Sequence, residues 1–249
     1  MNVPLPQPVS EPPDGPSVRV AETFLSIQGE GKLAGVPSYF IRLSGCNLRC
    51  GWCDTPYASW NPEGAAKAID SLAAEAAASG ARHVVLTGGE PMMFPQTPAL
   101  TRLLAAAGLH VTIETAGTID SDATCHLLSL SPKLASSTPI EGDPRDPTGA
   151  WRARHEARRL NPEALRALLS RHPERQLKFV AANPADIAEI EAVLAGLPFV
   201  EPSDVMLMPE GVRPPTADHR AWVTRACIEH GWRYCSRLHI ELFGNVRGT

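Results

Sequence analysis

The sequence predicts an α/β fold in which a parallel sheet is covered by helices. Short apolar runs of strand length alternate along the chain with alanine- and leucine-rich runs of helical period, and this alternation is typical of strands joined by helical crossovers. The 249 residues are enough for one substantial hydrophobic core. We therefore expect an open sheet or a partial barrel, with ligands at the carboxyl ends of its strands.

The elements are expected to alternate from residue 18 onward. The apolar runs predict strands near residues 18–24, 38–44, 83–87, 110–114, 127–131, 177–181, 205–208 and 234–240. The runs with helical period predict helices near residues 64–78, 98–107, 162–171, 184–194 and 216–230. Together they indicate one domain over residues 18–249.

Two segments depart from this rhythm. Residues 1–17 carry six prolines and almost no apolar periodicity, so we expect a disordered or extended tail. Residues 134–160 combine turn-forming residues with a basic run. This segment is an inserted excursion, and both a lid and a plain solvated loop fit its composition.

Composition and charge exclude several classes of function. The chain is 43% hydrophobic with a net charge of -4, which is typical of a globular protein and lacks the basic excess of a nucleic-acid binder. No apolar run approaches the roughly 20 residues of a membrane span, and the first residues do not resemble a signal peptide. We expect a cytoplasmic protein with a small-molecule partner, and no nucleic acid or membrane.

The stretch SGCNLRCGWCDT places Cys46, Cys50 and Cys53 within eight residues of a chain that has six cysteines. In a reducing compartment such a group indicates metal binding or catalysis, because disulfides are rare there. A structural zinc site needs four ligands, and the next histidine is His83, 30 residues beyond Cys53. Three thiolates on a four-iron cluster would leave one iron open for a substrate or cofactor. The other cysteines, Cys125, Cys227 and Cys235, are expected to be inert.

A second stretch, VVLTGGEP at residues 84–91, ends an apolar strand with two glycines and a carboxylate. Glycine allows a ligand to approach the backbone closely, and Glu90 could neutralise an ammonium group. A simple strand-to-helix turn is the alternative interpretation.

The spacing C-x3-C-x2-C, with Trp52 before the third cysteine, resembles the radical S-adenosylmethionine enzymes. The resemblance implies a partial, incomplete parallel β/α barrel with a [4Fe-4S] cluster on Cys46, Cys50 and Cys53. The open iron of this cluster would bind S-adenosylmethionine, and one electron would cleave the cofactor to a 5'-deoxyadenosyl radical. No protein residue is assigned a catalytic role beyond that radical. The implied cofactor contacts are Trp52, Asp54, Gly89, Glu90, Ser131, Pro132 and Lys133.

Four segments in order, FLSIQGEGKLAGVPSYFIRLSGCNLRCGWCDT, LTGGEP, IETAGT and LSPK, resemble the 7-carboxy-7-deazaguanine synthase family. This family contracts the ring of 6-carboxy-5,6,7,8-tetrahydropterin with loss of ammonia, in the biosynthesis of queuosine and other deazapurines. The resemblance implies that Thr55 binds Mg²⁺. The implied substrate contacts are Ile27, Gln28, Gly29, Glu30, Arg42, Thr87, Glu114 and His239.

The carboxyl-terminal part departs from the family pattern. Where relatives have a QTHK-like stretch, this chain has SRLHIELFGNVRGT, which keeps only His239. We expect residues 207–211, LMPEG, near the cofactor and the chain end at Thr249 near the substrate.

Two other functions remain open from the sequence. One is an activase that installs a glycyl radical on a partner protein, and the other is a non-catalytic zinc or iron–sulfur binding module. For the synthase, the expected partners are the pterin, an electron donor such as a flavodoxin or ferredoxin, and a second copy of the chain in a homodimer.

Overall fold

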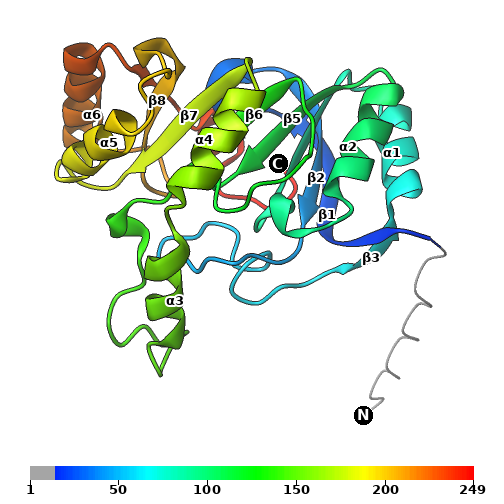
Figure 1. Cartoon of the computed structure of the whole chain (residues 1–249), viewed down its shortest axis with the longest axis horizontal. Helices are drawn as coiled ribbons and strands as arrows, with labels where there is room; N and C mark the ends of the chain where they lie inside the picture. The colour runs from blue at the N-terminus through cyan, green and yellow to red at the C-terminus, as the bar shows by residue number, and fades with distance from the viewer. Residues whose placement is uncertain (1–14) are drawn as a thin grey trace.

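The computed structural model describes residues 15–249, so most of the expected proline-rich tail lies outside the described residues, and its last residue, Ser17, already belongs to a strand. Nine strands form one sheet in the order β3-β1-β2-β4-β5-β6-β7-β8-β9. The edge strands β3 and β9 do not pair with each other, so the sheet is open (Figure 1). The predicted α/β class with an incomplete barrel is confirmed.

The central part of the sheet is parallel, as predicted. Its strands are β2 (Pro37–Leu43), β4 (His83–Gly88), β5 (His110–Thr115), β6 (Leu127–Leu130), β7 (Arg175–Ala181), β8 (Val205–Pro209) and β9 (Arg233–Tyr234). The crossover helices are α1 (Ile69–Ala78), α2 (Thr97–Ala106), α4 (Pro162–Arg171), α5 (Asp186–Ala195) and α6 (Ala217–His230). Short 3-10 turns lie at Gly31–Leu33, Pro91–Met93, Ala135–Ser137 and Pro202–Asp204.

The two faces of the sheet have different chemistry because successive side chains of a strand point to opposite faces. On β4, Val84 and Leu86 belong to the main core together with residues of the crossover helices, whereas Thr87 lines a cavity. On β7, Leu177 and Phe179 pack in that core and Lys178 between them lines the cavity. The helices therefore cover the apolar face, and the polar face is left for a ligand.

The amino-terminal strands differ from the prediction of an all-parallel sheet. Strand β1 (Ser17–Ile27) pairs antiparallel with β2, because residues 28–36 form a compact turn closed by the Gln28 N–H bond to Val36 O (2.8 Å). A parallel connection needs a crossover of about a dozen residues or more. Strand β3 (Ala65–Ala68) also pairs antiparallel with β1, in the register Ser17 to Ala68. The helix predicted for residues 64–78 therefore begins only at Ile69.

The last predicted strand, residues 234–240, is also wrong beyond its first residue. Only Arg233–Tyr234 pair with β8, and α7 (Leu238–Phe243) follows. Residues of this segment instead bind the turn after β1: Leu238 N–H donates to Gly29 O at 2.9 Å. Tertiary contacts here override the local propensity.

The excursion at residues 134–160 contains a helix that was not predicted, α3 (Ala150–Arg158), which projects below the sheet in Figure 1. No helix among the described residues has the length and apolar character needed to cross a membrane.

Candidate active site

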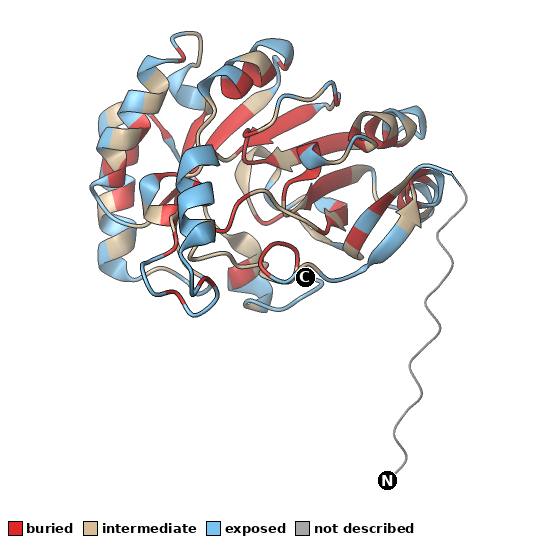
Figure 2. Cartoon of the chain, turned by 60° about the horizontal axis from the view of Figure 1, so that its bottom comes forward, coloured by how far each residue is buried: buried red, intermediate tan, exposed pale blue. Residues whose placement is uncertain are grey.

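A cavity of about 320 Å³ lies at the carboxyl ends of the parallel strands, within the usual range of small-molecule sites. Strands that surround it are buried over much of their length (Figure 2). Most of the residues assigned from the sequence line it: Ile27, Gln28, Gly29, Glu30, Arg42, Trp52, Asp54, Thr55, Thr87, Gly89, Glu114, Ser131, Lys133 and His239. Met208, Glu210, Gly211 and residues 245–249 line it as well. Cys46, Cys50, Cys53, Glu90 and Pro132 are not part of the cavity lining.

One group of polar side chains connects the turn after β1 with β4 and β5. The Gln28 amide donates to one oxygen of Glu114 (3.1 Å), and the Thr87 hydroxyl donates to the other (3.0 Å). The side-chain oxygen of Gln28, Oε1, accepts from Glu30 N–H at 3.2 Å. This group presents both donors and acceptors, so it can recognise an amide-like edge of a ring.

A second group is centred on Glu30. One Glu30 oxygen pairs with Lys178 and the other with Arg237 Nε at 3.1 Å. Arg237 also pairs with Asp54, directly after the last cysteine of the loop. Burial would raise the pKa of Glu30, but Lys178 and Arg237 outweigh burial and hold the pKa far below its ordinary value. Glu30 is therefore an ionised acceptor.

His239 closes this group from the carboxyl-terminal side. Its ring lies against Gly29, where a Cβ would come within 1.9 Å of His239 Nδ1. Burial lowers the pKa of His239, although Glu30 acts in the opposite direction. The imidazole is therefore disposed to remain neutral, with one ring nitrogen as an acceptor.

A third group surrounds Arg42, which lies on β2 in register with Thr87 of β4. Arg42 Nε donates to Glu22 at 2.7 Å, and the Tyr57 hydroxyl donates to the same Glu22 oxygen at 2.7 Å. Arg247 donates to the other Glu22 oxygen at 3.0 Å and lies 4.0 Å above the Tyr57 ring. Burial would lower the pKa of Arg42, but Tyr57 and Glu22 raise it, so the guanidinium stays charged at the cavity wall.

The three predicted cluster ligands lie on the loop between β2 and β3, and all three thiols are free. Burial raises the pKa of Cys50 to about 12, although Lys133 acts against it, and burial also raises the pKa of Cys46. Without a metal these two thiols are protonated, and binding iron would displace the protons.

The loop carries an unusual concentration of unsatisfied polar groups. Four buried polar atoms without a hydrogen-bond partner lie here: Ser44 Oγ, Asn47 Oδ1, Arg49 Nε and, on the segment packed against the loop, Ser136 Oγ. Native structures leave few such atoms unpaired. Three thiols beside these atoms fit a cofactor that the polypeptide does not supply, and a thiolate-bound iron–sulfur cluster matches the donor set.

The number of ligands separates a structural zinc site from the cluster. The loop carries three thiols, and within residues 15–249 no three histidine, cysteine, aspartate or glutamate side chains, these thiols included, are already arranged around a metal ion. A structural zinc site would require four ligands around one ion.

The two glycines after β4 are explained by a close approach of two backbones. A Cβ at Gly88 would lie 2.2 Å from Leu43 O, and one at Gly89 would lie 2.1 Å from Gly45 O. Gly89 N–H and Glu90 N–H donate to these same carbonyls at 3.1 and 2.9 Å. The glycines therefore hold the start of the cysteine loop against the sheet, and they also line the cavity.

Glu90 directly follows these two glycines and is fully buried. It accepts from Met92 N–H (2.9 Å), the Thr115 hydroxyl (2.7 Å) and Ala116 N–H (2.8 Å). Burial raises its pKa despite these bonds. Its contact with the cofactor amino group stays a prediction, because in this structure its oxygens bind the protein.

The residues predicted for the cofactor after β6 lie beside Trp52. Lys133 Nζ donates to Ser131 Oγ at 2.8 Å and lies 5.8 Å from the centre of the Trp52 ring. Trp52 also packs against a small cluster that contains Met208. This end of the cavity thus combines a cation, an aromatic face and apolar surface, which suits an adenosyl group with a carboxylate.

The excursion at residues 134–160 packs on the cysteine loop. Arg49 N–H donates to His155 Nδ1 (3.1 Å), and Gly51 N–H donates to Ser137 O (2.8 Å). Trp52 Nε1 donates to Ser136 O at 3.2 Å. Three residues of the loop therefore donate hydrogen bonds to backbone or imidazole acceptors of the excursion.

Several residues that line the cavity were not predicted from the sequence. Lys178 could have been found, because it alternates with Leu177 and Phe179 and must share the face of Gln176 and Val180. Tyr57, Arg237 and Arg247 carry no comparable local signal, since their partners are distant in sequence.

Comparisons with known proteins agree with this geometry. Residues 40–178 match the Radical SAM superfamily. A 7-carboxy-7-deazaguanine synthase from Halobacterium salinarum is 47% identical over 244 residues, covering 95% of this chain and 94% of the relative. One from Rhodopirellula baltica is also 47% identical, over 94% of this chain and 89% of the relative.

Among solved structures, the crystal structure of QueE from Escherichia coli superposes with a TM-score of 0.67 at 27% identity. The match covers 90% of this chain and 95% of that one.

Proposed function

Because the chain belongs to the 7-carboxy-7-deazaguanine synthase family of the radical S-adenosylmethionine superfamily, we propose that it converts 6-carboxy-5,6,7,8-tetrahydropterin to 7-carboxy-7-deazaguanine with loss of ammonia. The observation that carries the proposal is one cavity in which three polar groups meet beside the three-cysteine loop. When bound, the cluster and S-adenosylmethionine would supply the radical that takes a hydrogen atom from the substrate.

The polar groups complement the chemistry of the pterin. Its amino-pyrimidinone edge has adjacent donors and acceptors, which Gln28 and Glu114 can satisfy. Glu30 is ionised and can accept from ring N–H groups. Arg42 remains charged at the wall and can pair with the substrate carboxylate.

We assign Mg²⁺ to Thr55 as part of the same proposal. The Thr55 hydroxyl lies at the cavity and its Oγ1 is 3.8 Å from Cys53 Sγ. Magnesium keeps several waters and takes one or two protein oxygens together with oxygens of the substrate. A single hydroxyl is therefore a sufficient protein ligand when a substrate carboxylate is present.

The free cysteines indicate the compartment in which the enzyme works. All six are free, which suits a reducing compartment such as the cytoplasm.

A low-potential carrier such as a flavodoxin or ferredoxin would supply the electron. A homodimer is also expected, and sedimentation equilibrium would test it.

The deciding experiment is a reconstitution under anaerobic conditions. Protein loaded with iron and sulfide is incubated with dithionite, S-adenosylmethionine and 6-carboxytetrahydropterin, and the products are analysed by mass spectrometry. We expect a product smaller than the substrate by the mass of ammonia, and none when S-adenosylmethionine is omitted. Consumption of S-adenosylmethionine without any change in the pterin would contradict the proposed substrate. Glycyl-radical formation on a partner protein would instead favour the activase.

A further inference from the structure

Helix α3 covers the outer side of the cysteine loop. The ring of His155 accepts from the backbone of Arg49, the residue just before Cys50. The Arg49 guanidinium stacks over the Trp151 ring, and the distance from Arg49 Cζ to the centre of the ring is 3.9 Å. Arg145, which precedes the helix, donates to Gly51 O at 2.8 Å. The residues of the loop between the cysteines therefore contact this segment directly.

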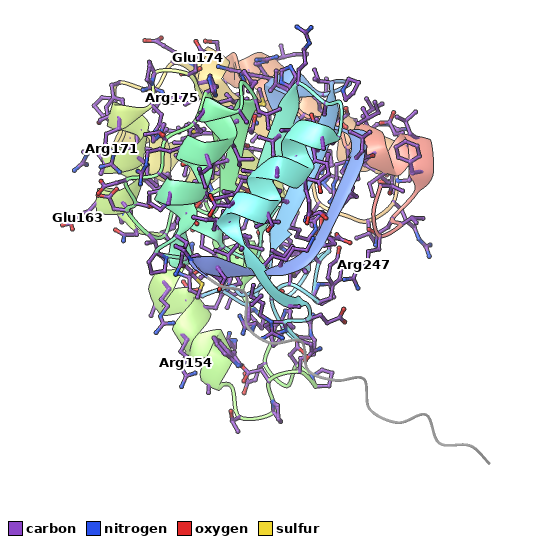
Figure 3. All side chains as sticks on the ribbon, turned by 90° about the vertical axis from the view of Figure 1, so that its right-hand side faces the viewer. Arg154, Glu163, Arg171, Glu174, Arg175 and Arg247 are labelled. Atoms are coloured by element: carbon purple, nitrogen blue, oxygen red, sulfur yellow. The ribbon has the colours of Figure 1, made fainter. Side chains whose placement is uncertain are left out.

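The exposed surface of α3 is positively charged. Arg152, Arg154 and Arg158 are exposed, and within residues 15–249 none of them has an ion-pair partner. The one carboxylate of the helix, Glu156, is neutralised by Arg159 at 2.8 Å. Figure 3 shows Arg154 on this helix at the end of the molecule, away from the sheet. The patch is local, because the whole chain has a net charge of -4.

We propose that α3 is the docking surface for the protein that supplies the electron, and that this partner is a small acidic carrier with a flavin or an iron–sulfur centre. The proposal rests on the proposed function, which requires one electron for each cleavage of the cofactor. In the docked complex one electron leaves the reduced centre of the carrier and enters the cluster. The carrier is oxidised by one electron, the cluster is reduced by one, and no bond or proton is transferred in this step.

Two observations favour this face. The inner side of the loop borders the cavity through Trp52, Asp54 and Thr55, which the cofactor and substrate occupy in the proposed function. The outer side is reached through α3, whose His155 and Trp151 touch the loop directly. Because electron transfer slows steeply with distance, a carrier has to bind near this loop. Exposed arginines attract an acidic surface and accelerate its association.

The test compares two sources of electrons with the reconstituted enzyme. Dithionite is a small reductant and needs no docking surface, whereas a reduced flavodoxin does. In the variant Arg154→Glu/Arg158→Glu we expect turnover with dithionite to match that of the unaltered enzyme. With limiting flavodoxin we expect turnover to fall about tenfold or more, within the 10–10³ range that electrostatic steering provides.

A binding measurement gives a second readout that does not depend on turnover. The affinity for oxidised flavodoxin, measured by calorimetry, should fall by a similar factor in the variant. In the unaltered enzyme it should weaken when ionic strength rises from about 0.1 M to about 1 M, which shortens the screening length from about 10 Å to about 3 Å.

The matched control is Arg102→Glu/Arg225→Glu, which reverses two exposed arginines on α2 and α6 and leaves α3 unchanged. This control should keep both its flavodoxin affinity and its flavodoxin-driven turnover. Equal losses in the control and the α3 variant would overturn the proposal, as would an α3 variant that binds flavodoxin normally. An α3 variant that loses dithionite-driven turnover or iron content to the same extent would also overturn it, because α3 would then act only as a support for the loop. Failure of the unaltered enzyme to make product with dithionite would count against the proposed function instead.

Discussion

Replacing His155 should release the cysteine loop and impair assembly of the cluster. His155 is fully buried, and its Nδ1 accepts from Arg49 N–H. Since Nδ1 is an acceptor, the ring proton lies on Nε2 and is donated to Ser137 Oγ at 2.9 Å. Ser137 in turn accepts from Gly51 N–H through its carbonyl. One imidazole thus organises the backbone on both sides of Cys50.

The cost of His155→Ala can be worked from these contacts. A buried N–H left without an acceptor costs about 1–3 kcal/mol, and losing the bond to Ser137 removes about 1 kcal/mol more. The sum, about 2–4 kcal/mol, is the free energy by which the variant destabilises the ordered conformation of the loop. Because three ligands of the cluster lie on this loop, we expect a lower iron content after reconstitution and faster loss of iron to a chelator.

The same residue predicts a pH dependence of stability. Burial lowers the pKa of His155 to about 4, from an ordinary value of 6.5. Between these values the unfolded chain binds a proton that the folded chain does not, so the stability rises with pH in this window. The contribution is fully present above about pH 6.5 and lost as pH falls toward 4, with a total of about 3 kcal/mol. In His155→Asn, which keeps an acceptor and cannot be protonated, this part of the pH dependence should disappear.

The assays are urea unfolding from pH 4 to 7 and iron content after anaerobic reconstitution. The matched control is His172→Asn, directly after α4, because His172 is also buried and also bonds to backbone carbonyls, those of Leu168 and Ala123. It should lower stability without affecting iron content. If His155→Ala bound as much iron as the unaltered protein and held it as long, the proposed role of the excursion would be wrong.

The remaining predictions concern the cavity and the loop. Cys50→Ala should abolish the visible absorbance of the reconstituted cluster, whereas Cys125→Ala should leave it unchanged; a normal spectrum for the first variant would refute the ligand assignment. Arg42→Ala should lower kcat/KM for the pterin by the equivalent of about 2–5 kcal/mol at constant iron content, because the substrate carboxylate would lose its charged partner. Unchanged steady-state kinetics would contradict the pairing of Arg42 with that carboxylate. Thr55→Ala should raise the Mg²⁺ concentration needed for turnover, and identical titration curves would exclude that role. Lys178→Met should destabilise the fold by about 3 kcal/mol in urea, because it leaves the Glu30 carboxylate with one cation instead of two; a change below about 1 kcal/mol would show that Arg237 compensates alone.

The sequence predicted those parts of the fold whose pattern is local. Helix α4 begins at Pro162 and ends at Arg171 as expected, with Asn161 capping Ala164 N–H at 3.2 Å. The central strands are buried on both faces and appear in the sequence as short apolar runs. By contrast, the pairing of β3 with β1 depends on a partner about fifty residues away, which an alanine-rich stretch does not reveal.

The candidate site was predictable where the chemistry requires adjacent residues. The cysteine spacing and the glycine pair lie within single loops, so their pattern survives in the sequence. The partners of Glu30 do not, because Arg237 follows it by 207 residues and reaches it only when the carboxyl-terminal segment folds back. Helix α3 was missed for a similar reason, since its one buried residue is His155, and a helix with one inward side chain shows no apolar period.

Two glutamates that look alike in the sequence have different environments in the fold. Glu30 in QGEG has a lowered pKa, because two cations outweigh its burial, and each of its oxygens still has a free lone pair for a substrate N–H. Glu90 in GGEP has a raised pKa, because it is fully buried without a direct ion pair, and it accepts three hydrogen bonds from its own chain. At neutral pH Glu30 is therefore ready to accept from a ligand, whereas the Glu90 side chain already accepts from Met92 and from β5, and its predicted contact with the cofactor amino group would add to these bonds. A motif fixes which residue is present, and the surrounding charges and burial decide whether its pKa is lowered or raised.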